Sequence, residues 1–180
     1  MENLEKLFEE TLRDVYYAEK AILKNLPKMA RKASSEKLRT AFEEHVEQTE
    51  EQVGRLEQIF ELIGKSARGK RCPAIDGLAE EASEIMQEAD DDTVRDAGML
   101  AAAQAVEHYE IARYGTLAAW ADKLGMKDAV KLLQTTLEEE KQTDLKLSKL
   151  AVSEINLDAD SADTKSSATR RKGGSTEKRA

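Results

Sequence analysis

The chain has 180 residues and a formal net charge of −8 at pH 7, a length that suits one domain around a single core. It holds two prolines, nine glycines and 4% aromatic residues beside abundant Ala, Leu, Glu and Lys, which favours an all-helical fold. Cys72 is the only cysteine, which excludes an intramolecular disulfide and a cysteine-based zinc cluster.

Four long segments have the apolar spacing of amphipathic helices, and each would be about 45 Å long at the rise of an α-helix. In chain order they span 2–32, 35–63, 93–124 and 127–155. Residues of capping type stand at their boundaries: Ser34 or Ser35 and Asp92 or Thr93 at two starts, Gly64 and Gly125 at two ends.

Short connections join the first helix to the second and the third to the fourth, which makes each pair an antiparallel hairpin. Residues 64–92 form a long crossover between the hairpins, and the stretch from Asp76 to Ala89 reads as a short extra helix within it. Two hairpins joined by such a crossover predict a ferritin-like four-helix bundle over residues 1–158.

The last part of the chain differs in composition from the rest. Residues 161–180 carry six Lys or Arg and two Asp or Glu, a net charge of +4, which leaves −12 for residues 1–160. This Ser, Thr, Lys, Arg and Gly-rich stretch lacks the apolar residues needed to offset ordering entropy, so we expect residues 159–180 to be a disordered basic tail. The acidic body argues against nucleic acid as a partner and leaves only a weak contact through the tail.

The sequence contains no pattern that predicts export or membrane insertion. Residues 1–5 lack the basic and apolar regions of a signal peptide, and no apolar run reaches the roughly 18 residues that span a bilayer. We therefore expect a cytoplasmic protein that does not enter the membrane.

The expected buried face of each helix is interrupted near its middle by polar side chains. The interruptions are Glu19 on the first helix, His45, Thr49 and Gln52 on the second, Glu107 and Glu110 on the third, and Glu140 and Asp144 on the fourth. Folding each hairpin about its turn brings them to one level, so we expect a single polar layer across the bundle.

Five ionised carboxylates within a core would each cost several kcal/mol by order of magnitude unless a cation compensated them. Carboxylate oxygens with one imidazole suit Fe²⁺ or Mn²⁺, and facing bundle helices build two-metal sites in this way. The predicted ligands, for one or two ions, are Glu19, His45, Glu107, Glu110, Glu140 and Asp144. A hydrogen-bonded core histidine is the other reading of His45, while Thr49 and Gln52 read as hydrogen-bond partners of the ligands.

Four segments resemble the YciE/YciF family of ferritin-like bacterial stress proteins, and the resemblance extends over residues 3–155. They are LRDVYYAEK at 12–20, EHVEQTEEQV at 44–53, VEHYEIARYG at 106–115 and LEEEK at 137–141. The resemblance implies a ferritin-like bundle, homodimerisation and a di-metal centre. The chain departs from the usual di-iron pattern, because its second and fourth helices lack an inward Glu-x-x-His pair and His45 stands where a glutamate is expected.

The sequence is compatible with three functions. The first is a metal-binding stress protein that reacts Fe²⁺ or Mn²⁺ with dioxygen or peroxide. The second is a non-enzymatic dimeric scaffold whose polar layer is a hydrogen-bond network. The third, protection of nucleic acid, rests on the basic tail alone and is opposed by the acidic body.

Overall fold

The computed structural model describes residues 1–161, and all regular structure within this range is helical. The elements are α1 (Leu4–Lys32), α2 (Glu36–Leu62), α3 (Pro73–Glu88), α4 (Asp92–Lys123), α5 (Lys127–Leu150) and a π-helical turn, η1 (Ala151–Ile155). The four long helices agree closely with the four predicted segments, and the all-α prediction is confirmed.

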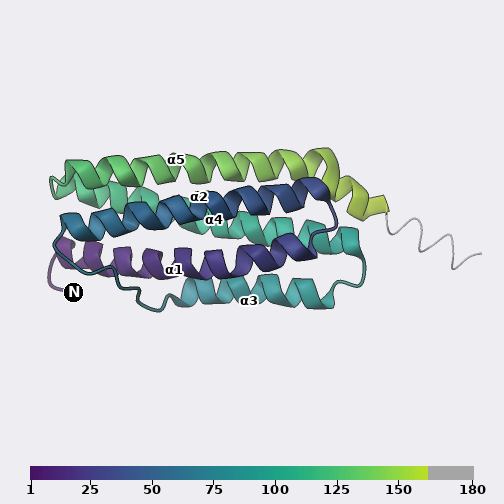
Figure 1. The fold of residues 1–180 in the computed structure, drawn as a ribbon, viewed down its shortest axis with the longest axis horizontal. Helices are drawn as coiled ribbons and strands as arrows, with labels where there is room; N and C mark the ends of the chain where they lie inside the picture. Colours follow the sequence, from purple (N-terminus) through teal and green to yellow (C-terminus); the bar gives the residue numbers. More distant parts are fainter. Residues whose placement is uncertain (162–180) are drawn as a thin grey trace, which may run out of the picture.

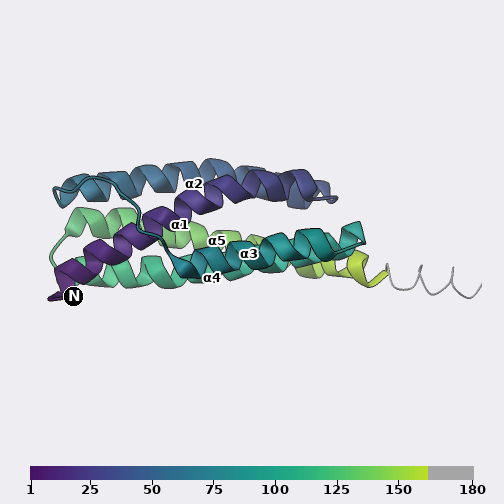
Figure 2. The same cartoon turned by 90° about the horizontal axis from the view of Figure 1, so that it is seen from below.

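Two antiparallel hairpins, α1 with α2 and α4 with α5, form the bundle (Figure 1). They pack with α2 against α5 and with α1 against α4. Helix α3 lies outside the four, against α1 and α4, and the view from below shows it running beside α4 (Figure 2). The long crossover and its extra helix thus give the ferritin-like arrangement that the sequence predicts.

Local chemistry fixes where the long helices begin and end. The side chains of Asn3, Ser35 and Asp91 accept hydrogen bonds from backbone N–H groups in the first turns of α1, α2 and α4. Gly64 and Gly125 follow the ends of α2 and α4 with φ angles of 67° and 75°, a conformation that strains any other residue.

Two predicted boundaries in the crossover region are wrong by a few residues. Helix α3 begins at Pro73 and not at Asp76. Proline suits the first helical position, because the N–H group that it lacks would have no partner within the helix there and its fixed φ is already close to the helical value. Helix α4 is capped by Asp91, which accepts from the N–H groups of Thr93 and Val94, and not by Asp92 or Thr93.

The core consists of two apolar clusters at opposite ends of the bundle. One contains Leu26 of α1 and Phe42 of α2 among its buried members. The other contains Leu12 of α1 and Phe60 of α2. The polar layer predicted from the interrupted helix faces lies between these clusters, with apolar packing on both sides.

A buried carboxylate joins the two hairpins. Asp96 of α4 is 2% exposed and accepts hydrogen bonds from the backbone N–H and hydroxyl of Ser34, at 3.0 and 2.6 Å, and from the N–H of Ser35, at 2.7 Å. These donors lie in the turn between α1 and α2. Asp96 therefore holds that turn against the start of α4 and helps to set the level at which the helices face one another.

Residues 156–161 continue as helix after η1, so the first three residues of the predicted tail are helical. The remainder of that predicted tail lies outside the described residues. Across residues 1–161, no helix combines the length and apolarity that crossing a membrane requires.

Candidate metal centre

Each of the four bundle helices contributes to one buried polar layer. The side chains come from Glu19 on α1, His45 on α2, Glu107 and Glu110 on α4, and Glu140 on α5, and none is more than 5% exposed. Each interrupts an apolar helix face, as the sequence indicates, and the hairpin register brings all of them to one level.

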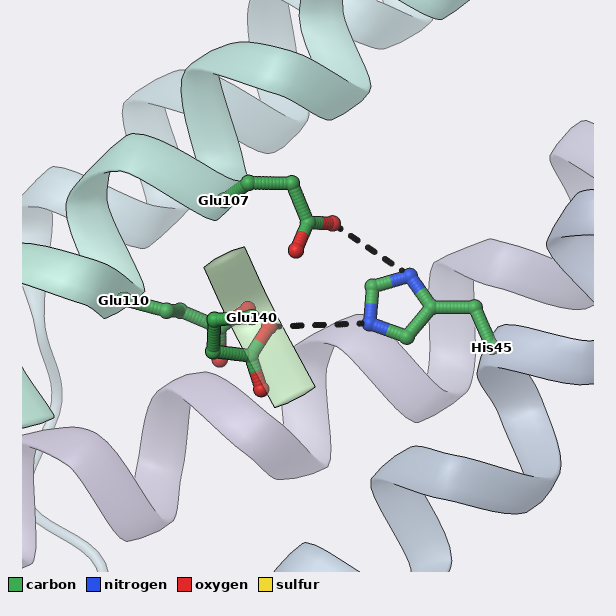
Figure 3. A group of neighbouring side chains, drawn as sticks. All are labelled: His45, Glu107, Glu110 and Glu140. Atoms are coloured by element: carbon green, nitrogen blue, oxygen red, sulfur yellow. Dashed lines mark ion pairs between the residues drawn. The ribbon is translucent and has the colours of Figure 1, made fainter. Parts of the chain in front are cut away.

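Four of these side chains form a close group, shown in Figure 3. His45, Glu107, Glu110 and Glu140 each offer one ligand atom, and these atoms all lie within 4.8 Å of one another. His45 Nδ1 lies 3.3 Å from Glu107 Oε1, and its Nε2 lies 4.0 Å from Glu140 Oε2. The imidazole therefore stands between carboxylates of α4 and α5.

Glu19 belongs to the same layer but has a hydrogen-bond partner of its own. Its Oε1 accepts a short hydrogen bond from the hydroxyl of Tyr114 on α4. Its side chain interacts electrostatically with Glu110 and Glu140, so it borders the group of four. The sequence indicates that Glu19 faces inward, and the structure adds Tyr114 as the residue that orients it.

Asp144 lies apart from this group. Its side chain is 19% exposed, and its Oδ1 is 3.3 Å from Nε2 of the exposed His108 and 3.3 Å from Nε2 of Gln104. Residue 144 is four positions beyond Glu140, which turns it about 40° further around α5 and toward the outer side of α4. That rotation accounts for its distance from the inward-facing set.

Burial sets the protonation of the layer. The pKa values of Glu107 and Glu110 lie well above 4.5, because burial and the neighbouring carboxylates disfavour their charge. Burial likewise raises the pKa of Glu19 to about 8 and that of Glu140 to about 7. Burial lowers the pKa of His45 to about 4, so its imidazole is neutral at pH 7. A neutral imidazole is the form that binds metals.

Several buried polar atoms of the layer have no hydrogen-bond partner within the described chain. They are Glu19 Oε2, His45 Nε2, both carboxyl oxygens of Glu107 and Glu110, and Glu140 Oε2. Leaving a buried polar atom unsatisfied costs about 1–3 kcal/mol. Lone pairs on carboxyl groups and on one imidazole nitrogen, with their atoms within 4.8 Å of one another, suit Fe²⁺ or Mn²⁺. The residues present therefore fit a divalent metal centre.

A second set of contacts supports the centre from α2 and α5. Gln52 Nε2 donates a short hydrogen bond to Glu140 Oε1 and lies 3.3 Å from Glu139 Oε2. Arg55 contacts both oxygens of Glu139, at 2.6 and 2.7 Å. Gln52 thus has the expected hydrogen bond to Glu140, whereas the hydroxyl of Thr49 donates to the backbone carbonyl of His45.

The pair of Arg55 and Glu139 does not stand out in the sequence. Glu139 sits in a run of three glutamates, only one of which faces the core, and Arg55 lies among charged residues of an outer helix face. The only available signal is that Arg55 follows Gln52 by three residues, on the same side of α2.

Comparison with known proteins identifies the chain. Residues 3–160 match the family described as a domain of unknown function (DUF892). The chain belongs to this family. It is 47% identical over 161 residues to Protein YciF of Escherichia coli (strain K12), across 89% of this chain and 97% of YciF. The resemblance to the YciE/YciF family is therefore confirmed.

Solved structures share the fold of this chain. The crystal structure of the E. coli stress protein YciF matches with a TM-score of 0.83 and 47% identity, over 87% of this chain and 99% of that one. YcfI of Rhodopseudomonas palustris matches with a TM-score of 0.80 and 50% identity, over 82% of this chain and 94% of YcfI. A Xanthomonas campestris protein shares the fold with a TM-score of 0.70 at 20% identity, over 89% of this chain and 99% of that protein.

Proposed function

We propose that this protein is a stress-response protein that binds Fe²⁺ or Mn²⁺ in its central layer and promotes their oxidation. The observation that carries the proposal is the set of buried, unpartnered oxygen and nitrogen atoms contributed by all four bundle helices. The part concerning stress rests on the name of the E. coli relative, which is described as a stress protein.

The proposed ligands are His45, Glu107, Glu110 and Glu140, whose ligand atoms lie closest together. Glu19 is the proposed additional ligand if two ions bind, through the oxygen that Tyr114 leaves free. Asp144, whose partners are His108 and Gln104, stays a sequence-based expectation. Carboxylates on α1, α4 and α5 would supply the negative charge that balances the cations.

A bound Fe or Mn ion would supply reversible one-electron chemistry. The chain supplies the surroundings. His45 keeps a neutral imidazole because burial lowers its pKa to about 4. Tyr114 orients Glu19, and Gln52 orients Glu140. The two apolar clusters flank the layer, and burial between them strengthens its electrostatic contacts.

The test compares two glutamates of α5. Glu140→Gln removes a proposed ligand with little change in volume, and Glu138→Gln alters an exposed carboxylate two residues away. We expect wild type and Glu138→Gln to oxidise Fe²⁺ at equal rates and Glu140→Gln to lose most of that activity, whether dioxygen or peroxide is supplied. Equal rates in all three proteins would refute the proposal.

A dimeric scaffold without metal is the alternative. It is favoured by the single inward histidine and by the R. palustris relative, which is described as a candidate structural protein. The unpartnered Nε2 of His45 counts against it, because a hydrogen-bonded layer should satisfy that atom. A scaffold predicts one melting temperature with and without chelator, whereas a metal centre predicts a lower one after chelation.

A further inference from the structure

Two cavities reach His45 from opposite sides of the bundle. One, of about 40 Å³, lies between α1, α3 and α4 and touches both His45 and Glu107. The other, of about 190 Å³, lies between α2 and α5 and touches His45. Two cavities therefore border the candidate centre, and they differ in chemistry.

The cavity under α3 is apolar. Its walls come from side chains such as Leu26 of α1, Leu78 and Ala82 of α3, and Ala103 and Val106 of α4. The polar groups on its wall are Asn25 and, where it meets the layer, His45 and Glu107. Its volume holds about three molecules of the size of water. An apolar space of this kind favours small uncharged molecules over solutes that need hydrogen bonds.

The cavity between α2 and α5 has more polar groups on its wall than the cavity under α3. Thr143 donates a hydrogen bond to Gln48 across it at 3.2 Å, and Lys146 forms an ion pair with Glu44 at its edge. Amide, hydroxyl and charged groups can replace the hydration of an ion or of a molecule with O–H groups. This cavity therefore suits cations, water and peroxide, and the apolar cavity does not.

Desolvation decides which oxidant the apolar cavity would admit. Hydrogen peroxide has two O–H donors and would lose hydrogen bonds to water along walls made of Leu, Ala and Val side chains. Dioxygen has no donor, needs no solvation and is small enough for the space. The walls of this cavity discriminate against peroxide and against every charged solute.

We propose that the apolar cavity under α3 binds dioxygen and delivers it to the side of the centre formed by His45 and Glu107. This inference rests on the proposed function, and it names dioxygen as the oxidant. In the overall reaction, two Fe²⁺ ions each lose one electron, and one dioxygen takes up both electrons with two protons from water and leaves as hydrogen peroxide.

The first test uses metal-free protein and does not depend on the metal. Dissolved dioxygen is paramagnetic, so in wild type it should broaden the NMR signals of the methyl groups of Ala82 and Ala103 more than those of exposed alanines. Ala103→Leu fills the cavity, and Ala101→Leu adds the same atoms at an exposed position of α4. We expect the extra broadening at Ala82 to be lost in Ala103→Leu and kept in Ala101→Leu.

Overpacking by Ala103→Leu could cost stability, so a second filling variant is needed. Ala79→Leu adds bulk to the α3 wall at a half-buried position, where the helix can adjust. It should also remove the extra broadening at Ala82. Equal broadening in wild type and in both filling variants would overturn the inference.

The second test uses Fe²⁺-loaded protein. Both filling variants should slow oxidation by dioxygen and leave oxidation by hydrogen peroxide unchanged, while Ala101→Leu changes neither rate. An unchanged dioxygen rate in the filling variants would overturn delivery through this cavity. If dioxygen broadens the methyl signal of Ala82 but the protein binds no Fe²⁺, the proposed metal centre is refuted and the dioxygen site is not. The failure of the proposed function and the failure of this inference are therefore distinguishable.

Discussion

Glu110 shows how burial acts on a single residue of this bundle. Its side chain is 1% exposed, and burial with nearby Glu19 and Glu140 raises its pKa well above 4.5. The sequence predicts this residue well, because a glutamate between apolar neighbours at helical spacing has to face inward. Its orienting neighbours are harder to predict, since Tyr114 and Arg55 reveal their partners only after the helices pack.

The stability of the metal-free protein should fall as pH rises from 6.5 to 8. The folded-state pKa values of Glu19 and Glu140, about 8 and 7, exceed their ordinary 4.5, so the folded chain holds protons that the unfolded chain has released. His45 acts in the opposite direction: its pKa of about 4, against 6.5, costs stability only as pH falls below 6.5. Above pH 6.5 the carboxyl groups alone determine the trend within the layer.

Thermal melts in chelator at pH 6.5 and pH 8 would measure this effect, with Glu140→Gln as the control that should show a smaller difference. Added Mn²⁺ should raise the melting temperature more at pH 8 than at pH 6.5, because metal binding displaces protons from the carboxyl groups. A melting temperature that is equal at both pH values without metal would contradict the assigned protonation.

Replacing Glu110 by Gln should separate folding from metal binding. The substitution keeps the side-chain volume and removes a carboxyl group whose ionisation in the core costs free energy. The melting temperature of the metal-free protein should therefore not fall. The rise in melting temperature on adding Mn²⁺ should disappear, whereas Glu138→Gln, which alters an exposed carboxylate, should keep the full rise. A full rise in Glu110→Gln would remove that residue from the proposed ligand set.

At the scale of the element, the long helices follow from apolar spacing and capping residues. The sequence predicts α1, α2, α4 and α5 within a few residues, because the apolar face of each helix continues at the same spacing on both sides of the polar layer. The start of α3 is less predictable, since Pro73 fits both a loop and the first position of a helix. The anchoring role of Asp96 also requires packing, because its donors lie 61 and 62 residues away in sequence.

Asp96→Ala should destabilise the fold strongly. It leaves three donors of the turn between α1 and α2 without their buried acceptor, and we expect a loss of about 3 kcal/mol in the free energy of unfolding. Asp92→Ala, at an exposed position of the same helix, should change it by less than about 1 kcal/mol. Urea denaturation of both variants would check this, and similar losses would contradict the anchoring role.

At the scale of the whole molecule, the crossover gives the bundle two different sides. Helix α3 covers the pair α1 and α4 with apolar side chains, while the opposite pair, α2 and α5, meets across polar residues. The sequence predicts the bundle and the existence of the crossover helix, because helix lengths and loop lengths decide them. The two cavities depend on how side chains of three helices fit together, which periodicity does not encode.

Homodimerisation stays a prediction of the family resemblance. Large apolar side chains are exposed along the last part of the bundle, with Leu145 at 49% and Val152 at 75%, and a partner chain could cover them. Light scattering coupled to size exclusion should give the mass of two chains for wild type, and Leu145→Lys combined with Val152→Lys should shift it toward one. A wild-type mass of one chain at high concentration would contradict the prediction.

The most direct test of the account is the metal content of the protein itself. Wild type and Glu110→Gln would each be equilibrated without oxygen against Fe²⁺ or Mn²⁺, separated from free metal and measured by elemental analysis. The proposed metal centre should hold one or two ions tightly per chain in wild type and lose most of them in Glu110→Gln. A wild-type protein that retains no more metal than the variant would contradict the central claim.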